Sequence, residues 1–198
     1  MEFPWLAFSG FALAASISPG PNNVLIAAGA ADSGVRAVVP HMLGIAVGFG
    51  AMILIVGLGL AVPLATMPWL LEAMRWVGAA WIAVIAWQIA TASPPGEGRP
   101  RPPLGFFGAM AFQWINPKAW LLALGMATAW VSPGAPLAPQ FAVMAAMFAL
   151  AGVPSSLFWA MLGEQAGRLL RSRRAVQCFN GAMAALLVLS MLPVFLQG

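Results

Sequence analysis

The sequence has few charged residues: they make up 7% of its 198 positions, whereas hydrophobic residues make up 62%. The mean hydropathy is +0.90. A water-soluble domain has an apolar fraction nearer about half and about a quarter of its residues charged, so this chain has too little polar surface to cover a globule in water. The composition therefore predicts a polytopic membrane protein that lies in the lipid bilayer.

Cysteine and histidine are also scarce, with one of each. A single cysteine excludes a disulfide within the chain, and one cysteine with one histidine gives no cluster for a structural metal or a redox centre. The net charge of +4 comes from basic residues in short connections, which form no patch interleaved with aromatic residues of the kind that binds nucleic acid. We expect no cofactor, no metal and no nucleic-acid partner.

Long apolar runs fill most of the chain. A bilayer core requires about 20 apolar residues per helix, and this length divides the sequence into six candidate spans. The first and fourth spans are longer than one crossing needs, which leaves room for a tilt or a break. The predicted fold class is an all-α integral membrane protein with six transmembrane helices, near residues 4–31, 37–62, 69–92, 105–131, 140–163 and 176–196.

The arginines predict the orientation of these spans. Arg36 lies in the first connection, Arg99 and Arg101 lie in the third, and four more arginines lie in the fifth, between residues 168 and 174. The second connection has only Arg75. Because cytoplasmic loops carry the excess of Lys and Arg, the odd-numbered connections are predicted to be cytoplasmic. Both termini are then expected outside.

A proline- and glycine-rich linker, SPPGEGRPRPP at residues 93–103, separates two halves of the chain. It is the only connection that combines turn residues with charge, which is typical of a hinge between repeats. The predicted organisation is a first three-helix repeat at residues 1–92, a cytoplasmic linker at 93–103 and a second three-helix repeat at 104–198, all within one domain.

Each half opens with a span that polar residues interrupt, at ISPGPNN (residues 17–23) and WINPKAW (residues 114–120). Proline removes a backbone donor and clashes with the preceding turn, so each site should open its helix and free carbonyls and amides. With three spans per half, the two broken helices would enter from opposite faces and meet near the midplane. This is the pattern of a 3+3 inverted-topology repeat with broken first and fourth helices, typical of secondary transporters, in which paired interruptions mark the binding site.

The residues at the interruptions suit a zwitterionic solute. A helix that begins after Pro21 or Pro117 directs free amides and a positive dipole end at the gap, where they can hold a carboxylate. The only lysine, Lys118, lies near mid-bilayer, where a cation is costly and functional by default. The alternative interpretation is that these residues only kink the helices and that Lys118 extends toward the interface. The candidate binding residues are Ser18, Pro19, Gly20, Pro21, Asn22, Asn23, Gln113, Asn116, Pro117 and Lys118.

Three residues are candidates for proton coupling, namely Lys118, His41 and Asp32. Histidine is the side chain whose ordinary pKa lies nearest neutrality, and ionisable groups are otherwise scarce within the predicted spans. Packing or capping is the alternative use of His41. Asp32 lies near the predicted inner mouth, where its carboxylate either pairs with Arg36 four residues later or accepts a proton.

Several stretches carry a resemblance in their order and spacing. They are SPGPNN, GVRA (residues 34–37), LGIAVGFG (43–50), RWVGAAWIAVIAWQI (75–89) and FQWINPKAW (112–120). Together they resemble the LysE/RhtB family of amino-acid exporters over nearly the whole chain. The resemblance implies a multi-pass protein of the bacterial inner membrane that exports small amino acids or their derivatives, driven by the proton-motive force. WAMLG (159–163) is similar to the short members that export neutral amino acids, cysteine and O-acetylserine among them.

Other function classes fit these residues less well. An intramembrane serine protease needs a serine within hydrogen-bond reach of a histidine base, but the only histidine lies in the second span and no later span has a serine in a glycine-flanked turn. We therefore do not expect an enzyme. An ion channel would need a ring of like residues supplied by oligomerisation, and a lipid-headgroup flippase or scramblase would use the same broken helices. Both remain alternatives.

Two further patterns concern packing. Glu72 with Arg75 and Glu164 with Arg168 have the spacing of ion pairs on a helix surface, and we expect them at the membrane edges. The GxxxG pattern at residues 44–48 lets another helix approach closely. That approach serves packing within one subunit, gating, or the contact between the subunits of a homodimer.

Overall fold

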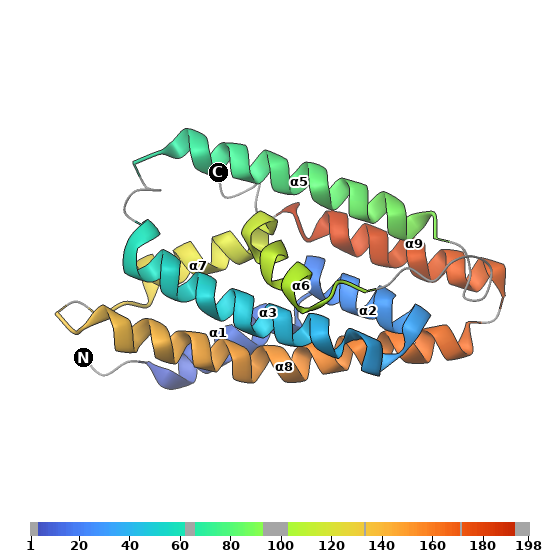
Figure 1. The fold of residues 1–198 in the computed structure, drawn as a ribbon, viewed down its shortest axis with the longest axis horizontal. Coiled ribbons are helices and arrows are strands. Elements are labelled where there is room, and N and C mark those ends of the chain that lie inside the picture. Colours follow the sequence, from blue (N-terminus) through green and yellow to red (C-terminus); the bar gives the residue numbers. More distant parts are fainter. Residues whose placement is uncertain (1–3, 62–65, 93–102, 133, 171, 193–198) are drawn as a thin grey trace.

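The structure is a computed structural model in which every described segment is helix, turn or short connection (Figure 1). Within the described residues there is no strand, which agrees with the predicted all-α class. The predicted linker at 93–103 lies outside the described part of the chain except for Pro103. The described ranges are 4–61, 66–92, 103–132, 134–170 and 172–192.

The helices correspond closely to the predicted apolar spans. The first predicted span contains two helices, α1 and α2, and the fourth contains α6, the 3-10 turn η2 and α7. A π-helical turn, η1, extends α3. The bounds are α1 Trp5–Ile17, α2 Pro21–Ser33, α3 Val35–Ile55, η1 Val56–Leu60, α5 Pro68–Ala90, α6 Phe106–Phe112, η2 Gln113–Ile115, α7 Pro117–Ala129, α8 Leu137–Leu169 and α9 Arg173–Leu189.

Within the described ranges, three continuous helical stretches are long and apolar enough to cross a membrane, namely Val35–Leu60, Pro68–Ala90 and Leu137–Leu169. The stretches Trp5–Ile17 and Phe106–Ile115 are apolar but shorter. These two short stretches are the leading segments of the predicted first and fourth spans, so each of those spans would need its second helix to complete a crossing.

Proline and glycine determine where several helices begin and end. Pro21, Pro68 and Pro117 each occupy the first turn of a helix, where the missing N–H would have no helical partner and the fixed φ suits the helix. Gly34, between α2 and α3, has a φ of 81°, a left-handed conformation that glycine adopts without strain. The chain can therefore end one helix and begin the next within a single residue.

The long helices lie roughly alongside one another in Figure 1, with α8 at one edge and α5 beside α9 at the other. Helix α8 packs against α1, α2 and α3. Its contact with α2 depends on Gly163 and Gly167, because a Cβ atom at these positions would collide with the backbone carbonyls of Ala27 and Ala31. Small residues of this kind let two helix backbones approach closely. Such close packing stabilises helix association in a membrane, because lipid provides no hydrophobic driving force for it.

The GxxxG pattern serves a contact within the chain. A Cβ atom on Gly44 would collide with the carbonyl of Phe106, and one on Gly48 would lie 2.7 Å from Cα of Met110. Both glycines therefore hold α3 against α6. Of the uses left open by the sequence, the structure shows packing within one subunit for this pattern, and gating and a homodimer stay predictions.

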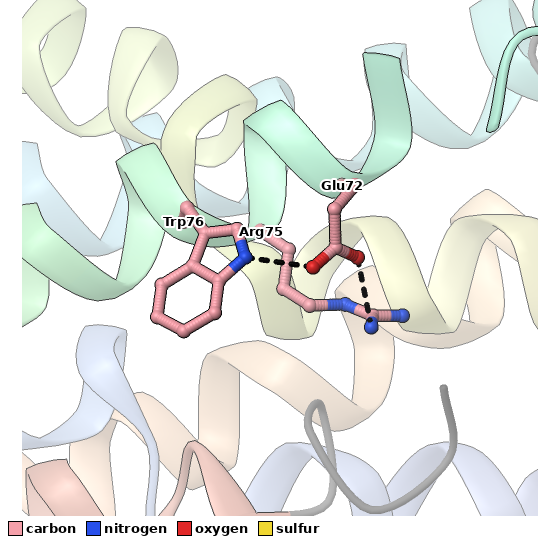
Figure 2. Close-up of polar contacts among 3 residues, drawn as sticks. All are labelled: Glu72, Arg75 and Trp76. Carbon is pink, nitrogen blue, oxygen red and sulfur yellow. Dashed lines mark hydrogen bonds and ion pairs between the residues drawn. The ribbon is translucent and has the colours of Figure 1, made fainter. Parts of the chain in front are cut away.

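Two ion pairs occupy the helix surface, as their spacing predicts. Glu72 Oε2 lies 3.1 Å from Arg75 Nη1, while Glu72 Oε1 accepts a 2.7 Å hydrogen bond from Trp76 Nε1 (Figure 2). Glu164 and Arg168 pair at 3.0 Å. Both pairs are confirmed, although exposed pairs add little stability.

The end of α8 differs from its prediction. The fifth span was expected to end at residue 163, with Arg168 in the following connection, but α8 continues to Leu169 and Arg168 lies in its last turn. A cation there is stabilised by the negative end of the helix dipole and by the carboxylate one turn earlier.

Candidate functional site

The first interruption consists of Ser18, Pro19 and Gly20, between the end of α1 at Ile17 and the start of α2 at Pro21. Gly20 is fully extended, with φ −176° and ψ 174°. Two prolines at alternate positions remove two of the backbone donors that would continue α1. The helix therefore stops, and its last carbonyls need partners from elsewhere.

Side chains from α8 and α2 provide those partners. The Ile17 carbonyl would pair with the residue four positions later, which is a proline, and instead accepts a 3.1 Å hydrogen bond from Trp159 Nε1. The Ser16 carbonyl accepts from Asn23 Nδ2 at 2.7 Å and from Ser155 Oγ at 2.8 Å. These bonds satisfy part-buried carbonyls that would otherwise be costly in a membrane.

Lys118 reaches the first interruption from the other half of the chain. Its ammonium donates to Ser18 Oγ at 2.7 Å, to the Ser18 carbonyl at 3.2 Å and to the Pro19 carbonyl at 3.3 Å. An ammonium has three donors, so these oxygens account for all of them. The glycine at position 20 leaves the necessary space, because a Cβ atom on Gly20 would lie 3.0 Å from Lys118 Nζ. Neither ion pair in the described part of the chain includes Lys118.

The second interruption consists of η2 and Asn116, between α6 and α7. Asn116 has extended backbone angles and caps α7, with its Oδ1 accepting a 3.1 Å hydrogen bond from the Lys118 amide. Pro117 is then the first residue of α7. Asn116 therefore has a local structural role, and its side chain is 2% exposed.

A pair of amide side chains joins the two interruptions. Asn22 Nδ2 donates to Gln113 Oε1 at 2.9 Å, and Gln113 Nε2 donates to Asn22 Oδ1 at 3.3 Å. Gln113 Nε2 also donates to the Ala109 carbonyl at 2.8 Å, and Gln113 is completely buried. The amide pair and Lys118 together connect residues about a hundred positions apart, so they fix how the two halves meet.

The two helices that follow the interruptions differ at their first amides. Helix α7 has its Asn116 cap, whereas α2 begins at Pro21 with no side-chain cap. Exposed amides at a helix start attract anions through their N–H groups and the helix dipole. The start of α2 is therefore the better of the two positions for a carboxylate, and the Lys118 ammonium lies beside it.

A cavity of about 80 Å³ opens between the interruptions, and we call it the central cavity. This volume holds a few water molecules or a small solute. Phe49, Leu122 and Phe148 form part of its apolar wall. Three of the predicted binding residues do not line it, namely Ser18, Pro19 and Pro117. Ser18 and Pro19 nevertheless accept hydrogen bonds from the Lys118 ammonium. The predicted binding residues that do line it are Gly20, Pro21, Asn22, Asn23, Gln113, Asn116 and Lys118.

The other candidates for proton coupling lie elsewhere. His41 on α3 and Asp32 at the end of α2 line a second, larger cavity of about 510 Å³. The structure therefore separates these two residues from Lys118. Within the described ranges, no three His, Cys, Asp or Glu side chains come together in a way that would hold a metal ion.

The sequence interpretation missed the contribution of α8. Ser155 and Trp159 hold the end of α1, and Ser156 lines the central cavity. A signal for the two serines exists, because two adjacent serines directly after Pro154 are unusual inside an apolar span. Polar side chains at such depth generally face other helices rather than lipid.

Comparison with known proteins identifies the family of this chain. The model of the LysE type translocator family matches residues 13–195, so the chain belongs to that family. It is a membrane transporter and not an enzyme.

Curated relatives in bacteria carry a more specific name. The Cysteine/O-acetylserine efflux protein of Salmonella typhimurium (strain LT2) is 32% identical over 167 residues, which cover 83% of this chain and 85% of the relative. The protein of the same name from Escherichia coli (strain K12) is 28% identical over 190 residues, which cover 96% of each. No solved structure matches the chain.

Proposed function

We propose that this protein exports small amino acids or their derivatives from the bacterial cytoplasm by proton antiport, with its binding site in the central cavity. The relatives named for efflux of cysteine and O-acetylserine support this substrate class. The observation that carries the proposal is the contact of Lys118 with the first interruption, a half-buried cation that joins two broken segments beside a small cavity.

The proposed architecture is a 3+3 inverted repeat of six crossings in the inner membrane, with both termini outside. In this arrangement α1 with α2 and α6 with α7 form the two broken helices, and the interruptions meet near the bilayer midplane. The hydrogen bonds between Asn22 and Gln113 support the meeting of the two interruptions. Alternating access then occurs by rocking of one half against the other around this site.

The chemistry of the cavity suits both ends of an amino acid. The substrate carboxylate lies against the uncapped amides at the start of α2 and the Lys118 ammonium, which stabilise negative charge. The substrate ammonium takes the Ser18 and Pro19 carbonyl oxygens, which Lys118 occupies in the empty carrier and which face the cavity only once Lys118 leaves them. Substrate and Lys118 therefore compete for Ser18 and Pro19, and the carboxylate draws the lysine toward itself as the ammonium takes its place.

The cavity also limits what the carrier accepts. A volume of about 80 Å³ favours a short side chain, and Phe49 and Phe148 offer it an apolar wall. Large aromatic or basic substrates would need these rings to move. Small neutral side chains are therefore the proposed class.

The experiment that tests the proposal compares Lys118→Met with wild type in bacteria fed dipeptides to raise internal amino-acid pools. We expect excess extracellular amino acids that a proton uncoupler suppresses in wild type, and no excess in Lys118→Met at equal membrane abundance. Arg168→Met removes an exposed cation on α8 and should leave export unchanged.

The measurement is mass spectrometry of the medium. Full export by Lys118→Met would remove this residue from the mechanism. No excess of any amino acid from wild type, with the protein present in the membrane, would favour an ion channel or a lipid-headgroup flippase instead.

A further inference from the structure

The second cavity lies apart from the central cavity and is several times larger, at about 510 Å³. Residues of α2, α3, α5, α6 and α9 line it. None of its lining residues lines the central cavity. We call it the His41 cavity.

His41 is the unusual residue in this cavity. It is 1% exposed, and neither of its ring nitrogens has a hydrogen-bond partner among the described residues. A neutral imidazole carries one donor and one acceptor, and leaving both unsatisfied in a buried site costs free energy. Buried polar groups are normally paired, so an orphaned ring beside an open cavity indicates a group that exchanges a ligand there.

Few of the helices around His41 contribute a charged group to the His41 cavity. Asp32 on α2 also lines the cavity, and it is exposed at the end of its helix. The polar residues from α5 and α9 are Gln88 and Asn180, which are uncharged, and the lining residues from α6 carry no polar side chain. Among the residues that the structure describes, the ionisable ones that line this cavity are therefore Asp32 and His41.

The wall between the two cavities is thin. On α3, His41 lines the His41 cavity and the next residue, Met42, lines the central cavity. Where α6 continues into η2, Phe112 lines the His41 cavity and Gln113 lines the central cavity. Neighbouring helical residues point about 100° apart, so single helices separate the two spaces. A change of charge at His41 therefore acts on the same helices that shape the central cavity.

We propose that the His41 cavity is the proton site of this carrier, separate from the site that binds substrate. This inference rests on the proposed antiport function. In one half of the cycle the imidazole accepts one proton from hydronium in water on the outer side and becomes imidazolium. In the other half the imidazolium returns that proton to cytoplasmic water, which reaches the ring past Asp32. Substrate occupies the central cavity in the opposite half of the cycle, so the two ligands cross in opposite directions.

The test uses full-length protein in proteoliposomes and two readouts. The first is exchange of labelled O-acetylserine between equal pools, which requires binding and translocation but no net proton movement. The second is proton movement driven by an O-acetylserine gradient and reported by a pH-sensitive dye inside the vesicles. We expect His41→Gln to lose the proton movement and to retain exchange. Asn180→Ala alters the same cavity without removing an ionisable group and should retain both.

A second measurement needs no substitution at His41. Because the chain has one histidine, carbethoxylation of that ring in the wild-type carrier can be followed by mass spectrometry. Modification of His41 should abolish substrate-driven proton movement while exchange continues, and hydroxylamine should restore it.

The possible results distinguish failure of the proposed proton site from failure of the proposed export function. Proton movement retained in His41→Gln, or in the carrier modified at His41, would overturn this inference and leave amino-acid export standing. Absence of O-acetylserine and amino-acid exchange in wild type would overturn both the export function and the proton site that rests on it.

Discussion

The amide pair between Asn22 and Gln113 gives the sharpest test of how the two halves meet. Its reciprocal hydrogen bonds of 2.9 and 3.3 Å cross from α2 to η2, over 91 residues of chain. Hydrogen bonds between membrane helices contribute about 0.6 kcal/mol each on average, so the pair should be worth about 1 kcal/mol.

A double-mutant cycle isolates this value. Gln113→Leu alone leaves the Asn22 amide without its partner, and it also loses the bond to the Ala109 carbonyl. Asn22→Ala alone leaves part of Gln113 unsatisfied in a fully buried site. The loss at Ala109 occurs in both arms of the cycle and cancels, so the double variant should be less destabilised than the sum of the single ones by about 1 kcal/mol.

The assay is unfolding in mixed detergent micelles, followed by fluorescence of the nine tryptophans. Trp114 adjoins Gln113 and should report the local change. If the two single effects add to within about 0.3–0.5 kcal/mol, the amide pair is not formed in the membrane, and the contact between the two interruptions would lose its support.

Two further predictions concern the role of α8. Gly163→Ala places a Cβ atom against the Ala27 carbonyl and should lower the free energy of unfolding by about 1–3 kcal/mol through overpacking. Gly152→Ala on the same helix meets open space and should leave stability unchanged. The yield of monodisperse protein compares the two variants, and equal yields would contradict the close contact. Trp159→Phe removes the side-chain donor to the last carbonyl of α1, whereas Ser155→Ala removes one of two donors to the preceding carbonyl. The thermal midpoint in detergent should therefore fall further for Trp159→Phe, and the reverse order would refute this account of the carbonyls.

Much of the local structure could be predicted because proline acts over a few residues. Pro21 and Pro117 restrict their own φ and remove a helical donor, and each begins a helix in the structure. The apolar spans follow from length and composition in the same way. The end of α8 was predicted too early because the span was bounded by its apolar length, whereas the spacing of Glu164 and Arg168 stabilises another helical turn beyond it.

The candidate site was harder to predict because it depends on contacts between distant segments. The sequence indicates that Lys118 is costly within a membrane, but the oxygens that bind it belong to Ser18 and Pro19, 100 and 99 residues away. It predicts free amides after both Pro21 and Pro117, whereas the Lys118 amide of α7 pairs with its Asn116 cap. Nothing local to α8 indicates that Trp159 completes the end of α1.

The sequence by itself determined a helical membrane protein, its interruptions and the residue types placed at them, because hydropathy, proline geometry and turn chemistry act locally. Only the tertiary structure decided which carbonyls bind Lys118, which amides pair, and that His41 lies in a cavity of its own. The reason is that a freed donor or acceptor must find a partner in a solvent that offers none, and which distant side chain arrives depends on how all the helices pack together.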